Sequence, residues 1–108
     1  MRKIALSIAA LAVLVPAVHA APVEVLVKDD FFKPRSITIK KDRLVTWRWR
    51  GENPHNVAIK RAGSSRVVKR SALKTSGRFT YQFRRTGTWK AVCEVHDGMT
   101  MKVVVRSP

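Results

Sequence analysis

Four residues of this chain have side chains that could together bind a soft metal ion. Cys93, His96 and Met99 lie in the run Cys-Glu-Val-His-Asp-Gly-Met, and His55 lies far upstream in Asn-Pro-His-Asn-Val. They offer one thiolate, two imidazoles and one thioether, a ligand set that suits copper better than other common metals. Beyond residue 20 the chain has no other cysteine or histidine, and its one further methionine is Met101. This concentration in two short stretches favours a metal site over ordinary packing.

Taken singly, each of these residues also has an ordinary structural interpretation. His55 could be hydrogen-bonded in a turn, either methionine could fill the core, and Cys93 could be a buried, inert thiol. However, Cys93 has no second cysteine to pair with, and a free thiol in an oxidising compartment invites disulfides between molecules. Coordination to a metal would explain why such a thiol is tolerated.

The first twenty residues have the layout of a secretory signal peptide. Two basic residues follow Met1, an apolar run extends from Ile4 to Val15, and the segment ends in the small residue Ala20. This order predicts cleavage after Ala20 and export to the periplasm. The apolar run is shorter than the about 20 residues of a membrane span, although an uncleaved N-terminal anchor is the alternative. We therefore expect a signal peptide at 1–20 and one domain at 21–108, with no membrane span in the mature chain.

Positive charge dominates the chain. It carries 22 Lys and Arg against 7 Asp and Glu, a formal net charge of +15. Two of the basic residues lie in the first twenty, so +13 remains on residues 21–108. Ten basic residues and no acidic residue lie from Lys60 to Lys90. Such a field attracts acidic proteins, anionic lipids or nucleic acid, or it serves solubility alone. Export argues against nucleic acid as a physiological partner.

Alternation of apolar and polar residues with period two runs through most of residues 21–108. It predicts short, half-buried strands, with turns between them that are marked by Gly, Pro, Asn and Ser. The predicted strands cover 23–28, 36–40, 45–50, 78–83, 88–92 and 102–106. Short strands in so small a domain predict an all-β, Greek-key antiparallel β-sandwich. The basic stretch 60–77 lacks alternation, so we expect a long surface loop there, with a helical turn near 71–74.

The predicted strands bring the four candidate ligands within reach of one another. A tight loop between 88–92 and 102–106 would carry three of them, and Gly98 would ease its turn. His55 follows Pro54 at the start of another strand and could reach the same end of the sandwich. Two imidazoles and a thiolate near one plane, with a weak axial thioether, form an electron-transfer copper site. A rigid sandwich would hold these ligands nearly fixed in both oxidation states.

These residues resemble the cupredoxins, the small type 1 (blue) copper proteins, and the pattern is most similar to the amicyanin and plastocyanin group. The match covers nearly all of residues 21–108. Asp42–Trp47 followed by Asn53–Val57 resembles the family's approach to its first histidine ligand. Gly77–Phe83 followed by Gly87–Trp89 resembles its approach to the cysteine. Cys93-x-x-His96-x-x-Met99 before Lys102-Val103 has amicyanin-like spacing.

The resemblance implies one type 1 copper ion bound by His55, Cys93 and His96, with Met99 as the axial ligand. It also implies that Asn56 secures the ligand loop through hydrogen bonds. Met101 is a rival for the axial position, because it lies at the longer His-to-Met spacing that plastocyanins use. The register of Met99 before Lys102-Val103 favours Met99.

Our first functional hypothesis is a soluble, monomeric periplasmic electron carrier that cycles between Cu(I) and Cu(II), with the ring edge of His96 as the exit for the electron. The basic residues between Lys60 and Lys90 would steer an acidic redox partner, such as a c-type cytochrome or a dehydrogenase. The alternative is a periplasmic copper-binding protein for copper delivery, storage or tolerance, because two methionines lie near the site.

We do not expect an enzyme. Copper oxidases and nitrite reductases need further histidine ligands, and only His55 and His96 lie beyond residue 20. A zinc hydrolase with one Cys, two His and an open position would be the remaining possibility. It would need a general base near Cys93, and Glu94 and Asp97 are as well explained as solvated loop charges.

Overall fold

Residues 21–108, the part of the chain that the computed structural model describes, form nine β-strands, most of which have alternating apolar side chains. The predicted signal peptide at 1–20 lies outside the described residues. The strands are β1 (Val23–Lys28), β2 (Phe31–Lys33), β3 (Ser36–Lys40), β4 (Leu44–Trp49), β5 (Ala58–Arg61), β6 (Val67–Arg70), β7 (Arg78–Gln82), β8 (Gly87–Val92) and β9 (Thr100–Arg106).

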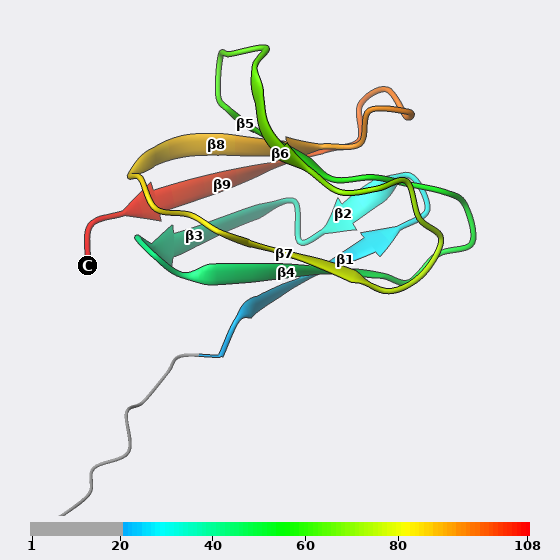
Figure 1. Ribbon diagram of the computed structural model, residues 1–108, viewed down its shortest axis with the longest axis horizontal. Helices are drawn as coiled ribbons and strands as arrows, with labels where there is room; N and C mark the ends of the chain where they lie inside the picture. Colours follow the sequence, from blue (N-terminus) through cyan, green and yellow to red (C-terminus); the bar gives the residue numbers. More distant parts are fainter. Residues whose placement is uncertain (1–20) are drawn as a thin grey trace, which may run out of the picture.

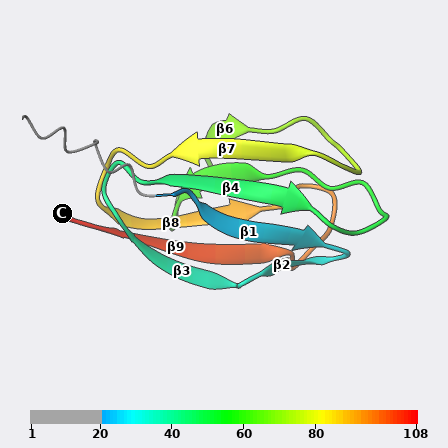
Figure 2. The ribbon, with the colours of Figure 1, turned by 90° about the horizontal axis from the view of Figure 1, so that it is seen from below.

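The strands form two sheets that pack as layers of a sandwich (Figures 1 and 2). One sheet has the order β2-β1-β4-β7, and the other has the order β3-β9-β8-β5-β6. The predicted all-β sandwich is confirmed, but the pairing is mixed rather than purely antiparallel. Strand β1 runs parallel to β4, and β3 runs parallel to β9. Period-two alternation reports which face of a strand is buried and not the direction of its neighbour, so these parallel pairs were not predictable from it.

The inward faces of both sheets form a dense apolar core. Trp47 is fully buried, and its ring lies 5.9 Å from that of Phe79 and 6.4 Å from that of Phe83. The alternating valines at 25 and 27 in β1 and at 103 and 105 in β9 are buried as well. Close-packed protein interiors resist local displacement, so this core provides a rigid frame for residues at the ends of the strands.

Segment 60–77 differs from the predicted long loop with a helical turn. Strand β5 continues to Arg61, and β6 pairs antiparallel with it, with a register irregularity at Ile59 and Lys60. Further along, Lys74 forms a β-bridge with His55, and no helix occurs in this segment. Strand β6 is the edge of its sheet and keeps exposed positions on both faces. An edge strand needs no apolar face and often carries lysine, which explains why alternation failed to reveal it.

Three connections lie at the same end of the sandwich. They are the β1–β2 turn, the β4–β5 loop and the β8–β9 loop, and Figure 1 shows all three at the end away from the C-terminus. Residues of these connections come from distant parts of the sequence but lie side by side. Among the described residues, no helix has the length and hydropathy needed to cross a membrane.

Candidate metal centre

Three of the four predicted ligands meet at this end of the sandwich. Sγ of Cys93 lies 3.5 Å from Nδ1 of His96 and 3.8 Å from Nδ1 of His55, and the two Nδ1 atoms are 3.1 Å apart. A point about 2.0 Å from all three atoms lies inside this triangle, close to the bond lengths of about 2.0–2.3 Å that zinc, a metal of similar size, forms with imidazole and thiolate. The three donors therefore fit one metal ion in a trigonal arrangement.

The backbone of His55 is held from two sides. His55 donates its N–H to the carbonyl of Lys74 at 2.9 Å and accepts the Lys74 N–H at 3.0 Å. The indole Nε1 of Trp49 also donates to the His55 carbonyl oxygen at 3.0 Å. Since the imidazole itself is fully buried, the ring has little freedom to leave the site.

Asp29 in the β1–β2 turn determines which nitrogen of His55 faces the site. Its Oδ1 lies 3.0 Å from Nε2 of His55. The backbone N–H of Glu52 and then that of Asn53 donate to the same carboxylate, and with the contribution of His55 they lower the pKa of Asp29 to about 2. An ionised carboxylate only accepts hydrogen bonds, so Nε2 must carry the proton. The lone pair of Nδ1 is then directed at Cys93 and available to a metal.

Gly51 makes the close approach of Asp29 possible. A Cβ atom at position 51 would collide with Oδ1 of Asp29 and would lie 2.6 Å from its Cγ and 2.9 Å from its backbone nitrogen. Only glycine therefore lets the β4–β5 loop wrap around this carboxylate.

The ligand loop from Cys93 to Met99 is closed by its own backbone. Cys93 donates its N–H to the carbonyl of Met99 at 2.9 Å, and Met99 donates to the carbonyl of His96 at 3.2 Å. Gly98 has a φ of 78°, in the left-handed region that favours glycine. The prediction that Gly98 eases this turn is confirmed.

Asn56 and Glu94 tie the two ligand segments together. Oδ1 of Asn56 accepts the backbone N–H of Glu94 at 2.8 Å, while Nδ2 of Asn56 donates to Oε1 of Glu94 at 2.8 Å. Arg70 binds the same carboxylate in a two-pronged contact of 2.9 and 2.8 Å. Arg70 first, and Asn56 second, lower the pKa of Glu94 to about 2. Asn56 thus makes the hydrogen bonds to the ligand loop that the resemblance implied, and Glu94 is a structural anchor rather than a solvated charge.

The second histidine has a carboxylate beside it as well. Nε2 of His96 lies 3.4 Å from Oδ1 of Asp30, and the His96 side chain is 31% exposed. Asp30 has a φ of 72°, a left-handed conformation that Asp tolerates in tight turns. Sequence analysis missed the neighbours Asp29 and Asp30. Two of only seven acidic residues, adjacent between two strands of a basic chain, were the signal that could have revealed them.

The two methionines have different surroundings although both side chains are 2% exposed. Sδ of Met101 accepts a hydrogen bond from Nε1 of Trp47 at 3.4 Å, inside the core. Met99 ends the ligand loop, and its backbone bonds to both Cys93 and His96.

A β-sandwich with two histidines and one cysteine converging at one end defines a class, the small copper proteins with a mononuclear site of soft ligands. Residues 23–106 match the model of one family, copper binding proteins of the plastocyanin/azurin family. The chain belongs to this family, and copper is its cofactor. The donor set described above is consistent with that metal, because thiolate and imidazole ligands both suit copper.

Solved structures share the fold. A purple cupredoxin from Nitrosopumilus maritimus is 22% identical with a TM-score of 0.68, covering 77% of this chain and 98% of its own. A reduced Cu(I) form of an amicyanin variant is 23% identical with a TM-score of 0.69, covering 83% of this chain and 87% of its own. The copper-containing nitrite reductase from Thermus scotoductus is 18% identical with a TM-score of 0.72, but this chain covers only 25% of it. No curated protein matches the sequence.

Proposed function

We propose that this protein is a small, soluble electron carrier of the periplasm that cycles one type 1 copper ion between Cu(I) and Cu(II). In this proposal His55, Cys93 and His96 are the equatorial ligands and Met99 is the axial ligand. One observation carries it: the donor atoms of His55, Cys93 and His96 lie within 4.8 Å of one another. Donors held together by the fold need little rearrangement when the metal changes its charge, and small rearrangement favours fast electron transfer.

The surroundings of the ligands support an electron-transfer role. Copper supplies the one-electron couple when bound. Asp29 holds His55 in the tautomer that presents Nδ1, and the buried position of His55 keeps water from that side. His96 is partly exposed, and its neighbour Val95 is 54% exposed, so an apolar surface lies beside the ring. We propose that electrons enter and leave through this edge of His96.

The contacts of Met101 support Met99 as the axial ligand. The sulfur of Met101 is already an acceptor for the indole of Trp47, and moving it would leave a buried N–H group without a partner. Such a loss costs about 1–3 kcal/mol. The same contact disfavours the alternative of a copper delivery, storage or tolerance protein. That alternative drew on two methionines near the site, and the sulfur of Met101 is already bound to Trp47.

We propose no enzymatic role. The nitrite reductase shares the fold, but the part that matches this chain is only 25% of its length. Its activity is therefore no basis for proposing the same activity here. Residues 21–108 contain only His55 and His96 as histidines, and both belong to the proposed site. We further propose that residues 1–20 are a cleaved signal peptide, that residues 21–108 form a monomeric domain, and that its partner is an acidic redox protein.

The test is to add one equivalent of Cu(II) to purified 21–108 and to record visible and EPR spectra and a voltammogram. An electron carrier should show an intense thiolate-to-copper charge-transfer band and a reversible one-electron wave. The Cys93→Ser variant is the matched control and should lose the band while keeping the fold. A colourless protein that binds only Cu(I) would refute the proposal and favour copper handling.

A further inference from the structure

Three lysines face one another across the outer side of the five-stranded sheet. Lys60 of β5 is the register partner of Lys90 of β8, and Lys90 is the register partner of Lys102 of β9. Lys90 and Lys102 are exposed, and Lys60 is half-buried. Their neighbours in the three strands point into the core, so the lysines point outward; these buried neighbours are Ile59, Ala91 and Met101. We call Lys60, Lys90 and Lys102 the lysine row.

The lysine row carries charge that the molecule itself does not neutralise. None of the five strands of this sheet contains Asp or Glu, and none of the three lysines has an ion-pair partner within 4.0 Å among the described residues. Like charges directly opposite one another in a sheet are destabilising. Lys40 and Arg106 form another such pair on the same sheet. An acidic partner bound to the row would reduce this repulsion between the lysines.

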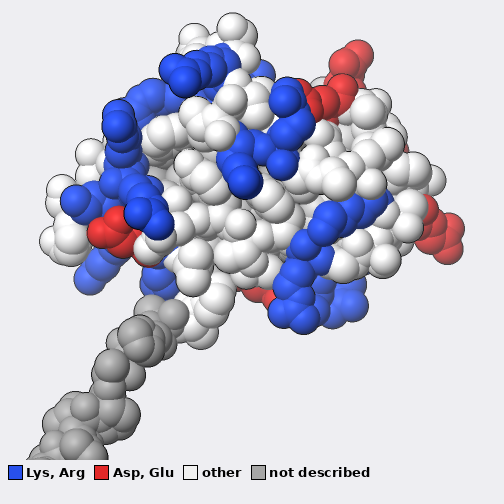
Figure 3. Space-filling model, viewed as in Figure 1, with Lys and Arg blue, Asp and Glu red and all other residues white. Residues whose placement is uncertain are grey.

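Other basic residues of the same region are already engaged. Arg70 binds Glu94, and the guanidinium of Arg61 stacks 4.6 Å from the centre of the Trp89 ring. Arg61 and Arg70 therefore have partners within the fold, whereas no side chain of the lysine row makes a hydrogen bond, salt bridge or cation–π contact among the described residues. Figure 3 shows how Lys and Arg spread over one face of the molecule, while Asp and Glu form a few separate groups.

The lysine row lies close to the metal site. Lys90 is three residues before Cys93 in the chain, and Lys102 is three residues after Met99. At about 3.3 Å per residue along a strand, the row is about 10 Å from the ligand loop. A partner on the row would therefore reach the neighbourhood of the copper ligands.

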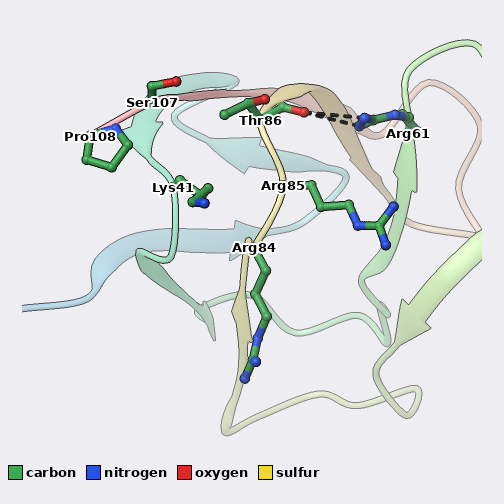
Figure 4. Close-up of a pocket in the computed structure, with 7 residues that line it drawn as sticks. All are labelled: Lys41, Arg61, Arg84, Arg85, Thr86, Ser107 and Pro108. Atoms are coloured by element: carbon green, nitrogen blue, oxygen red, sulfur yellow. Dashed lines mark hydrogen bonds between the residues drawn. The ribbon is translucent and has the colours of Figure 1, made fainter.

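A second basic area does not have this property. Figure 4 shows a hollow lined by Lys41, Arg61, Arg84, Arg85, Thr86, Ser107 and Pro108. Arg84 and Arg85 point in different directions there, so their charges do not converge. Thr86 precedes β8 and Ser107 follows β9, so the hollow is at the end of the strands opposite to Cys93. A partner bound in it would be separated from the metal by the length of the sandwich.

We propose that the lysine row is the docking surface for a carboxylate-rich electron-transfer protein. This inference rests on the proposed electron-carrier function and names the face that the partner uses. The three lysines extend from neighbouring strands, whose backbones lie about 4.8 Å apart, so their ammonium groups form one cationic surface that suits a group of carboxylates on another protein. The position of the row near the copper ligands favours an electron-transfer protein, because such a partner must bind close to the copper. Binding to an anionic membrane does not require a surface near the metal. Because redox complexes are small and transient, the row should act mainly on the association rate.

The experiment compares two variants of equal charge. One replaces the row (Lys60→Gln, Lys90→Gln, Lys102→Gln), and the control replaces three basic residues elsewhere (Arg66→Gln, Arg84→Gln, Arg85→Gln). The probe is cytochrome c whose lysines have been succinylated, which makes it acidic, and unmodified basic cytochrome c is its counterpart. At low ionic strength the row variant should react about tenfold more slowly with the acidic probe, and the control less than twofold more slowly. The difference should vanish at high salt.

Equal losses in both variants would overturn the proposal, since net charge alone would then explain the rate. The Lys→Arg triple variant at the same positions should retain the wild-type rate, and a loss there would also contradict docking by charge. Binding of the row to phosphatidylglycerol vesicles, without binding to the acidic probe, would overturn it in favour of a membrane surface.

Binding can be mapped separately from electron transfer. The reduced, copper-loaded protein is titrated with the reduced acidic probe, and amide NMR shifts are followed. Shifts on β5, β8 and β9 support the docking surface, and shifts confined to other strands overturn it. If the protein shows no reversible copper couple, the electron-carrier function fails, whichever strands the shifts report.

Discussion

Oδ1 of Asp29 lies 3.0 Å from Nε2 of His55, although 26 residues separate them in the chain. The same carboxylate accepts the backbone N–H groups of Glu52 and Asn53. Asp29 therefore fixes both the ring of a proposed copper ligand and the loop that carries it. Hydrogen bonds to the outer nitrogen of a histidine ligand orient the ring and raise its basicity.

Replacing Asp29 should weaken Cu(II) binding and raise the reduction potential. Asp29→Ala removes the acceptor for Nε2 of His55, and the loss of such a partner lowers metal affinity by about 10–100-fold. If Cu(I) binding changes little, each tenfold loss of Cu(II) affinity raises the potential by about 59 mV. Competition with a Cu(II) chelator and voltammetry measure both quantities.

Two further variants separate hydrogen bonding from charge at this position. Asp29→Asn keeps an acceptor oxygen but removes the charge, so it should show a smaller rise in potential than Asp29→Ala. Asp97 is in the ligand loop but makes no described hydrogen bond to either histidine ring. Asp97→Asn therefore removes a charge near the site and is the control. If Asp97→Asn and Asp29→Ala shift the potential equally, the orienting role of Asp29 is wrong.

A methyl group at position 51 should disturb the same contact. Gly51→Ala forces the added Cβ against Asp29 and should destabilise the protein by about 1–3 kcal/mol. It should also raise the potential, because the carboxylate is pushed away from His55. Gly63→Ala is the control: its Cβ meets nothing within 4 Å, but its φ of 82° strains alanine. Gly63→Ala should lose stability while its reduction potential stays unchanged. If the potential of Gly51→Ala is also unchanged, the close approach of Asp29 to His55 does not depend on Gly51.

The metal-free protein should lose stability in acid as two carboxylates become protonated. The pKa values of Asp29 and Glu94 are lowered in the fold to about 2, from ordinary values of 3.8 and 4.5. A lowered pKa means that the carboxylates contribute stability at pH values above their ordinary range. This contribution is lost as the pH falls from about 4.5 towards 2. Urea unfolding midpoints across this interval measure the loss.

Arg70→Gln provides the control for the acid effect. Arg70 is the largest cause of the lowered pKa of Glu94, so the variant should be less stable near neutral pH and should lose less stability in acid. A fall of the same steepness in the variant and the wild type would show that the contact between Arg70 and Glu94 does not contribute.

The two methionines should respond differently to replacement by leucine. Met99→Leu should change the visible and EPR spectra and shift the potential, because the axial ligand tunes a type 1 site. Met101→Leu should leave the spectra unchanged and lower the free energy of unfolding by about 1–3 kcal/mol, since Nε1 of Trp47 loses its acceptor. The reverse pattern would assign the axial position to Met101.

Sequence alone determined the β-sandwich and the convergence of His55, Cys93 and His96. The strands and the Cys93–His96 loop could be predicted from local patterns, whereas His55 was expected there from its place at the start of another strand and from the resemblance to the family. Period-two alternation identifies a half-buried strand from a few consecutive residues, and a Cys-x-x-His loop between two strands positions its own side chains. The role of Asn56 followed from the resemblance to the family. Segment 60–77 was misassigned because its edge strand β6 has no buried face to mark it.

Only the tertiary structure decided which residues support the ligands and where uncompensated charge gathers. Asp29 meets His55, and Trp47 meets Met101 across 54 residues, because strands distant in sequence pack side by side. The lysine row exists only through the register of β5, β8 and β9. Register is set where the buried faces of neighbouring strands pack together and by the loops that join them, and β5 and β8 are neighbours that lie far apart in the sequence. A pattern read along one strand does not show which residues of the next strand lie opposite it.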